Sequence, residues 1–436
     1  MPRSVVVIGA GIAGLTAAFR LQQAGFSVQV LEAADTVGGR MREARSGPIV
    51  YNTGARLIYP FGRELHNLID ELGLSDAMVP HQDLHAACRG ARGQYNIDLM
   101  PGLKALRTPG LAWRDRWRLV LSGVALARMR GAHNPDSAFS ALRFDDETLS
   151  SYIRRTAGDK VLELMVEPVF RGTRSWNPED ISAMFYLSTA PRLLSERTVY
   201  TLRGGMGLMT ARLAERLLVR RSASVLAVRR SPTGVCTVEY REGNAEKEIS
   251  ADTVVCATQG SRASALIADP TSQEQSLFDA VRYNALGAVH YALSEPLEPV
   301  LEFSTRSAVT RLAIWQQNPA ADGRPATLYC QLTPEAAAEA MRDGFTDHID
   351  TAIRDEIRQR IPRFDARVLH VANQWIPDML PLFYPGYGRT ATDFLRWQAT
   401  ASRDIYYCGD YLAQALLNGA CHSGADVARL INLHWH

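Results

Sequence analysis

The chain contains 436 residues, of which 46% are hydrophobic and 22% are charged, and its formal net charge is +2 at pH 7. This length favours two domains over one compact core, and the nearly balanced charge gives no electrostatic reason to expect a nucleic-acid partner. No run of eighteen uninterrupted apolar residues is present to form a transmembrane helix. The six cysteines form no CxxC pair, and we therefore expect a cytoplasmic protein without a disulfide framework.

The first forty residues have the pattern of a strand, a glycine-rich turn, a helix and a second strand. An apolar run at 5–8 is typical of a buried parallel strand, an amphipathic stretch at 15–22 predicts the helix, and a second apolar run lies at 28–31. The turn has the sequence Gly-Ala-Gly-Ile-Ala-Gly. A strand, a glycine-rich turn, a helix and a second strand in this order predict a dinucleotide-binding βαβ unit. The alternative interpretation of the glycines is a tight turn that binds no ligand.

Each glycine of the turn has a physical function in such a unit. Gly9 permits the tight turn, Gly11 lets the backbone approach a pyrophosphate, and Gly14 lets the helix pack closely on the strand. The helix N-terminus, which includes Ala13, offers free amides and the positive end of the helix dipole to the phosphates. The second strand ends at a carboxylate that can accept hydrogen bonds from both hydroxyls of an adenosine ribose, in the dipeptide Glu32-Ala33.

Two short motifs after the second strand resemble the flavin-containing amine oxidase superfamily, which includes monoamine and polyamine oxidases, protoporphyrinogen oxidases and carotenoid desaturases. The first is a glycine pair followed by arginine at 38–40, and the second is Gly-Ala-Arg-Leu at 54–57. The resemblance implies FAD as the cofactor. Its pyrophosphate and ribityl chain would contact Gly38, Gly39 and Arg40, and its isoalloxazine ring would lie beside Gly54, Ala55, Arg56 and Leu57.

The other end of the chain resembles the closing motif of the same superfamily. A strand ends at Gly409 and Asp410, and Asn418-Gly419-Ala420 opens a final helix. By the resemblance, the Asp410 carboxylate would hold the ribityl or phosphate region, and the amides of Gly419 and Ala420 would face the pyrimidine edge of the flavin. A helix N-terminus in that place would stabilise negative charge on the reduced ring.

Between these ends, helical and strand patterns alternate. Helical periodicity is present at 113–129, 146–155, 159–170 and 178–187, and strands alternate with helices from about 280 to 400. The arginine-rich stretch that begins at Trp113 could lie on a membrane surface. We instead favour a helix of the substrate domain with solvated arginines, and we do not expect a membrane partner.

The resemblance implies an α/β fold with two interleaved domains. An FAD-binding Rossmann-like domain of the glutathione-reductase type would comprise residues 1–75, 201–280 and 401–436, with Val225 packing at the adenine. An α+β substrate-binding domain, made of a helical part and a sheet, would comprise residues 76–200 and 281–400.

Four residues are candidates for the substrate pocket: Trp375, Tyr384, His290 and Arg56. Many amine oxidases carry a lysine in the strand that contains His290, and this chain has none there; a core histidine is the alternative. The motif around Trp375 and Tyr384 resembles that of protoporphyrinogen oxidases and desaturases. Ordinary aromatic core is the alternative for Trp375, and a surface loop is the alternative for Tyr384. In amino-acid oxidases an arginine close to the Arg56 position binds the substrate carboxylate, although support of the FAD phosphates would also explain Arg56. Leu416 stands where monoamine oxidases have an aromatic cage residue.

Three functions follow from these residues. The leading one is an FAD-dependent oxidase that transfers hydride from a C–N bond of a fairly large metabolite in a biosynthetic reaction and is reoxidised by O2. The second is a protoporphyrinogen oxidase-like or desaturase-like oxidation of a bulky apolar substrate, and the third is a non-redox escort protein. The sequence contains no set of metal ligands, and a homodimer is one option for its assembly.

Overall fold

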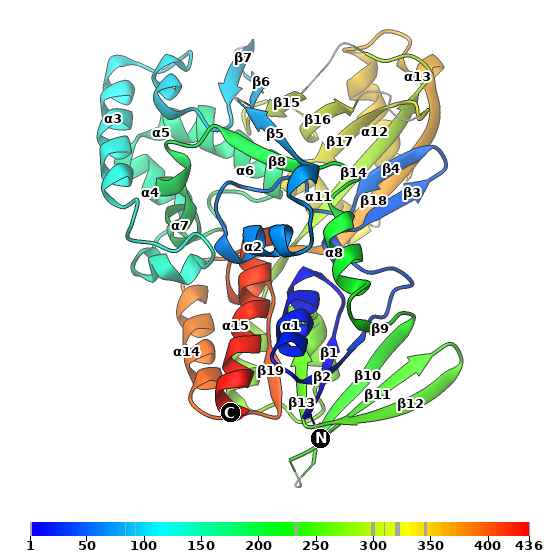
Figure 1. Ribbon diagram of the computed structural model, residues 1–436. Coiled ribbons are helices and arrows are strands. Elements are labelled where there is room, and N and C mark those ends of the chain that lie inside the picture. Colours follow the sequence, from blue (N-terminus) through cyan, green and yellow to red (C-terminus); the bar gives the residue numbers. More distant parts are fainter. Residues whose placement is uncertain are drawn as a thin grey trace.

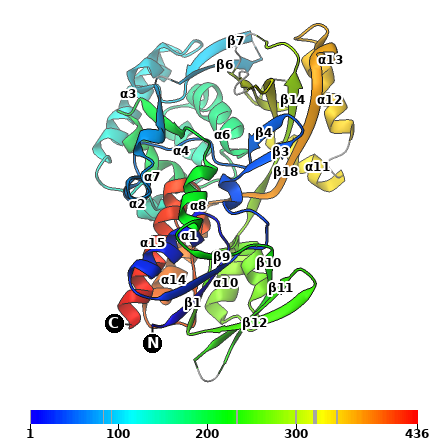
Figure 2. The same cartoon turned by 45° about the vertical axis from the view of Figure 1, so that its right-hand side comes forward.

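The computed structural model describes residues 2–82, 84–91, 93–231, 234–297, 301–308, 310–318, 323–343 and 347–435. A parallel sheet with its helices lies at one end of the molecule, together with both termini, and a helical part and a seven-stranded sheet lie side by side at the other end (Figures 1 and 2). The expected α/β class, with a Rossmann-like parallel sheet and a separate mixed sheet, is confirmed.

The parallel sheet joins segments from the start, the middle and the end of the chain. Its strand order is β19-β13-β1-β2-β9, and all neighbouring strands run parallel. Residues 5–8 are at most 3% exposed, because a parallel sheet is covered on both faces. The strands are β1 (Ser4–Ile8), β2 (Ser27–Leu31), β9 (Leu218–Arg220), β13 (Thr253–Cys256) and β19 (Ile405–Tyr407).

Alternate residues of β1 point to two different hydrophobic cores. Val5 and Val7 pack with helices α1 (Ile12–Gln23) and α15 (Leu417–Trp435), together with α2 (Arg63–Glu71) and α8 (Gly207–Ala214). Val6 and Ile8 pack on the opposite side of the sheet. The elements there are β10 (Ala223–Arg230), β11 (Cys236–Glu242), β12 (Ala245–Ala251), α9 (Gly260–Leu266), α10 (Ser272–Ala280) and α14 (Tyr387–Ala399).

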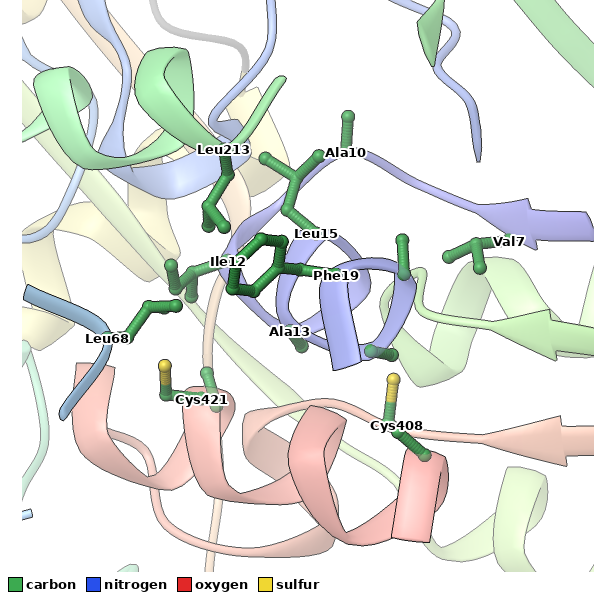
Figure 3. Close-up of a cluster of buried hydrophobic side chains, with 14 of the residues drawn as sticks. Val7, Ala10, Ile12, Ala13, Leu15, Phe19, Leu68, Leu213, Cys408 and Cys421 are labelled. Carbon is green, nitrogen blue, oxygen red and sulfur yellow. The ribbon is translucent and has the colours of Figure 1, made fainter. Parts of the chain in front are cut away.

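The first and last long helices of the described chain, α1 and α15, are in direct contact. Figure 3 shows Cys421 of α15 directed toward the α1 side chains, which include Ile12 and Phe19. At Gly424 the two backbones approach so closely that an added Cβ would lie 2.2 Å from the carbonyl oxygen of Ala13. The C-terminal helix is therefore held against the helix that starts the dinucleotide-binding unit.

The seven-stranded sheet has one face covered by helices and one face turned toward the rest of the molecule. In β14, Val289 and Tyr291 pack against α11 and α12, and His290 points to the other face because side chains alternate along a strand. All neighbouring strands are antiparallel except β15 and β6. The order is β18 (Val368–Pro381), β14 (Tyr283–Leu293), β17 (Ala326–Leu332), β16 (Leu312–Asn318), β15 (Leu301–Ser304), β6 (His85–Gly90) and β7 (Gly93–Asp98), and the helices are α11 (Pro334–Asp343), α12 (Asp347–Arg358) and α13 (Phe364–Arg367).

The helical part contains the four periodic stretches, but three of them differ from the predicted bounds. Two helices begin later than predicted because the hydroxyls of Thr148 and Ser182 cap their first turns. The stretch at 159–170 is interrupted by a π-helical segment. The elements are η3 (Gly102–Arg107), α3 (Trp113–Arg128), η4 (Ala138–Phe144), α4 (Leu149–Thr156), α5 (Asp159–Val161), the π-helical η5 (Leu162–Val166), α6 (Glu167–Arg174) and α7 (Ala183–Leu193).

Two short ribbons and three single helical turns complete the structure. The ribbons are β3 (Glu43–Ser46) with β4 (Ile49–Asn52) and β5 (Met78–Gln82) with β8 (Thr198–Leu202), and the turns are η1 (Gly39–Met41), η2 (Ser75–Ala77) and η6 (Asp410–Leu412). Within the described ranges, none of the helices combines the length and the apolar character that crossing a membrane requires.

We predict that Gly424→Ala destabilises the protein by about 2 kcal/mol, because the new methyl group overpacks the contact between α1 and α15. Gly131→Ala is the matched control, since a Cβ added there meets no atom within 4 Å. Urea unfolding of both variants measures the effect. Equal midpoints for the two variants would contradict the close approach of the helices.

Candidate functional site

A cavity of 1180 Å³ lies at the carboxyl ends of β1 and β2, which is the edge of a parallel sheet where α/β proteins bind ligands. It continues to the face of the seven-stranded sheet that carries His290. The cavity brings together most of the residues selected from the sequence: Gly9, Gly11, Ala13, Glu32, Ala33, Gly38, Gly39, Arg40, Gly54, Ala55, Arg56, Leu57, Val225, Gly409, Asp410 and Ala420.

The glycine-rich turn has an open backbone surface on the cavity side. Gly9 has a φ of +102°, which favours glycine, and its N–H donates to the carbonyl of Leu31 at 2.8 Å. Gly11 is the N-cap of α1, has no side chain to cap the helix, and leaves free space where a Cβ would lie. The first amides of α1 are therefore available to an anion, as a pyrophosphate requires.

Gly14 acts on packing and does not line the cavity. A Cβ on this residue would lie 2.1 Å from the carbonyl oxygen of Gly9, so only glycine lets α1 start this close to the turn. This position fits the packing function that the sequence predicts for the third glycine.

Glu32 lies at the end of β2 with its carboxylate fixed by two backbone amides. Oε2 accepts from the N–H of Ala10 at 2.7 Å, and Oε1 accepts from the N–H of Ala34 at 2.9 Å. Each carboxylate oxygen has a second lone pair, and the residue lines the cavity beside Ala33 and Val225. This end of the cavity has an oriented acceptor for ribose hydroxyls.

Arg40 and Asp410 form a two-pronged ion pair across the cavity wall. Nη1 and Nη2 of Arg40 donate to the two carboxylate oxygens at 2.8 and 2.9 Å, and Nη1 also donates to the carbonyl of Met379 at 2.6 Å. Burial lowers the pKa of Arg40 and the charge of Asp410 raises it, with a net pKa above the usual value. The pair connects the start of the chain, its end and the long strand β18.

Two of the three residues predicted at the start of α15 have packing contacts of their own. Asn418 is 2% exposed, and its amide donates to the carbonyl of Pro135 at 3.0 Å and to Oδ1 of Asp136 at 2.8 Å. A Cβ on Gly419 would lie 2.3 Å from the carbonyl oxygen of Gln414. Asn418 and Gly419 thus fix α15 to the neighbouring loops, and Ala420 lines the cavity.

His290 is a buried, neutral histidine at the end of the cavity away from Glu32. It is 3% exposed, its ring stacks on Tyr51 with centroids 4.4 Å apart, and its Nε2 lies 2.9 Å from Oε1 of Gln374. Burial lowers its pKa to about 4, partly opposed by Gln374 and reinforced by Arg56. Because the Gln374 oxygen is an acceptor, the contact assigns the proton of the neutral ring to Nε2.

Arg56 places a positive charge in the cavity wall beside His290. The centre of its guanidinium lies 3.9 Å above the ring of Tyr329, as in a cation–π contact. In the part of the chain that the structure describes, no carboxylate lies within ion-pair distance of this guanidinium. Arg56 can therefore bind an anionic group of a ligand.

Trp375 and Tyr384 lie outside the cavity. Trp375 is paired with Gly287 across β14 and β18 and packs on the helix-covered face, opposite to His290. The hydroxyl of Tyr384 donates to the carbonyl of Ala280 at 2.7 Å, and its partly buried ring packs against the core of the helical part. Aromatic core, the alternative weighed for Trp375, describes its position, and Tyr384 packs against the core of the helical part, in neither the cavity nor a surface loop.

The cavity residues that did not emerge from the sequence include Tyr51, Tyr329 and Gln331. The Tyr329 hydroxyl donates to Oε1 of Gln331 at 2.7 Å on the same face of β17, and both side chains line the cavity. Their spacing of two residues within an apolar strand is the signal that could have identified them.

We predict that His290 makes the protein less stable in mild acid. Between its folded pKa of about 4 and its ordinary value of 6.5, the unfolded chain binds more protons than the folded chain, so stability falls as the pH is lowered through this window. In the unmodified protein, His290 should lower the free energy of unfolding by up to about 3 kcal/mol between pH 7 and pH 4, and His290→Gln should abolish this decrease. Urea unfolding against pH measures this, with the exposed His85→Gln as control; parallel curves for both variants would contradict a neutral, buried His290.

Comparison with known proteins agrees with this geometry. The family model of the flavin containing amine oxidoreductases matches residues 12–432. The L-amino-acid oxidase of Mus musculus is 26% identical over 473 residues, which span 99% of this chain and 71% of that protein. Putrescine oxidase of Kocuria rosea is 41% identical over 160 residues, and protoporphyrinogen oxidase 2 of Arabidopsis thaliana is 24% identical over 183 residues. These two alignments cover 36% and 41% of this chain and about a third of each relative, 32% and 34%.

Solved structures show the same fold over the whole chain. A putrescine oxidase double mutant has a TM-score of 0.74 at 19% identity, and a putative protoporphyrinogen oxidase from Exiguobacterium has a TM-score of 0.74 at 18% identity; both comparisons cover 99% of each chain. The family model, which extends over almost the full length, confirms the resemblance seen in the sequence. The chain belongs to the flavin-containing amine oxidoreductase family, and its cofactor is FAD.

Proposed function

We propose that the protein is an oxidase that removes hydride from the carbon of a C–N bond in a fairly large metabolite, with O2 as the final electron acceptor. The observation that supports this proposal is the single cavity in which the glycine turn, Glu32 and Arg40 line one part and His290 and Arg56 line another. The reaction converts an amine, O2 and water into a carbonyl compound, ammonia and hydrogen peroxide.

The residues of the cavity fit FAD along its length. The free amides of α1 would hold the pyrophosphate, Glu32 would accept from the ribose, and the 54–57 segment would lie beside the ring. Bound FAD supplies the acceptor for the substrate hydride, and the protein contributes binding, orientation and electrostatics. The Arg40–Asp410 pair would hold the walls of the cavity in place around it.

The protein's own groups would favour a neutral amine next to a bound anion. The buried ring of His290 stays uncharged near neutral pH, so it adds no positive charge that would repel a substrate. Arg56 would bind a carboxylate of the substrate through charge-assisted hydrogen bonds. Aromatic rings of Tyr51 and Tyr329 beside these groups would exclude water from the reacting carbon.

A screen of the flavin-loaded protein tests the reaction class. Primary amines and 2-amino acids are mixed with the protein in air, and hydrogen peroxide and ammonia are measured. We expect equal amounts of both products from a subset of substrates. Loss of flavin colour with a porphyrinogen alone, in the absence of air, would instead support the bulky apolar substrate, and a protein that binds no flavin would support the escort function.

We predict that Glu32→Ala weakens FAD binding by on the order of 2 kcal/mol, or about thirtyfold in the dissociation constant, because a hydrogen-bonded charge is lost at the ribose. Glu215→Ala, at the exposed end of α8, is the control. Flavin fluorescence during titration of the apoprotein gives both constants. Unchanged retention of FAD by the Glu32 variant would contradict this placement of the ribose.

We predict that Arg56→Gln raises KM at least about tenfold for an amine that carries a carboxylate and leaves the matching amine without a carboxylate unchanged. Arg143, whose guanidinium lies 4.6 Å from the Phe144 ring outside the cavity, gives the control Arg143→Gln. Steady-state kinetics with the two substrates separate the effects. An equal change for both substrates would show that Arg56 does not bind the carboxylate.

A further inference from the structure

A second cavity, of 1130 Å³, lies in the helical part next to the cofactor cavity. The two spaces meet at side chains that line both of them: Leu57, Tyr59, Leu84, Leu99, Thr173 and Arg174. Leu57 belongs to the segment that would lie beside the flavin ring. The second cavity therefore opens toward the end of the site where the reaction takes place.

The walls of the second cavity are mainly apolar. Helix α3 contributes Leu126, the π-helical segment η5 contributes Met165, and α7 contributes Phe185. A π-helical turn is frequently found at functional sites, and here it forms part of the wall. Among the described residues of the wall, charged groups are confined to Asp98, Lys104, Arg107 and Arg174.

The mainly apolar walls of the second cavity favour some ligand groups over others. A polyamine chain carries ammonium groups, each of which would need a carboxylate partner when taken out of water, and Asp98 alone cannot supply them. A hydrocarbon chain needs no partner and gains free energy from the apolar area it removes from water. The cavity therefore fits an alkyl or similar apolar chain.

Thr173 and Arg174 mark the passage between the polar and the apolar space. The Thr173 side chain is exposed although it faces both cavities. The Arg174 guanidinium lies 5.1 Å from the Phe170 ring and 5.7 Å from the Phe185 ring, and its buried Nε has no hydrogen-bond partner. One end of the passage thus leads to Arg56 and His290, and the other leads into the apolar space.

The far end of the second cavity reaches the molecular surface. Leu103 of η3 and Val120 and Val124 of α3 line the cavity, and they are 87%, 37% and 44% exposed. A chain longer than the cavity could therefore extend out of it between η3 and α3.

We propose that the second cavity binds the apolar chain of an amphipathic substrate whose amine and carboxylate lie in the cofactor cavity. The position of this head group rests on the proposed function. The site for the chain rests on the second cavity itself, so binding of a chain can be measured without turnover.

Calorimetric titration of the flavin-loaded protein with linear fatty acids, from hexanoate to hexadecanoate below their micellar concentrations, tests the chain site. Each acid has a carboxylate for Arg56 and an apolar chain, but no amine to be oxidised. We expect one acid per protein and a dissociation constant that falls about three- to fourfold with each added methylene, until the chain reaches the surface opening.

Two variants test whether the apolar chain of the ligand lies in the second cavity. Thr173→Trp would block the passage and remove the dependence of the dissociation constant on chain length. Gly123→Trp would shorten the cavity, because a Cβ there meets no atom within 4 Å and the residue lines the wall, so the dissociation constant would stop falling at a shorter chain. Gly131→Trp, also in open space but outside both cavities, is the control.

The outcomes separate this proposal from the proposed function. A full chain-length dependence that survives Thr173→Trp, or no dependence in the unmodified protein, would overturn the chain site. If the fatty acids behave as expected and no amine is oxidised in the screen, the chain site stands and the oxidase function fails. Oxidation of short amines alone, without chain-length dependence, would support the oxidase function and overturn the chain site.

Discussion

The ion pair between Arg40 and Asp410 is the contact on which the rest of the site depends. Its partners are 370 residues apart in the sequence, and Asp410 is 6% exposed. A partly buried charge is stable only with its partner in place. This region of the site therefore forms only when the segment that contains Arg40 packs against the segment that contains Asp410. The third contact, to the carbonyl of Met379 in β18, brings the seven-stranded sheet to the same point. One guanidinium thus joins the glycine turn, the start of the last segment and the sheet that carries His290.

The alternation of side chains in β14 is the second constraint on the site. Val289 and Tyr291 are held in the core beneath α11 and α12, and this fixes His290 on the opposite face, in the cavity. A one-residue shift of the strand would bury a histidine among apolar side chains and expose a tyrosine to the cavity. The packing of one face therefore determines the chemistry of the other, and burial keeps the imidazole neutral.

Local motifs predicted the first strand, glycine turn, helix and second strand, and long-range packing explains the differences elsewhere. The strand, glycine turn, helix and Glu32 depend on residues close together in the chain, so their arrangement is visible in the sequence. Asn418, Trp375 and Tyr384 stand in the expected segments but face a loop or a core, because the side that a residue presents depends on elements distant in the chain. The second cavity had no local signal, since the elements of its walls, which include β7, η3, α3, η5, α6 and α7, are spread along the chain.

A double-mutant cycle on FAD binding tests most directly whether the Arg40–Asp410 pair joins the two ends of the chain at the cofactor site. The dissociation constant of FAD is measured for the unmodified protein, Arg40→Ala, Asp410→Ala and the double variant. If the pair acts as one unit, the double variant loses about as much affinity as the more damaging single variant, which corresponds to a coupling of at least about 1.5 kcal/mol. Losses that simply add would contradict a joint function of the two residues in holding the cofactor.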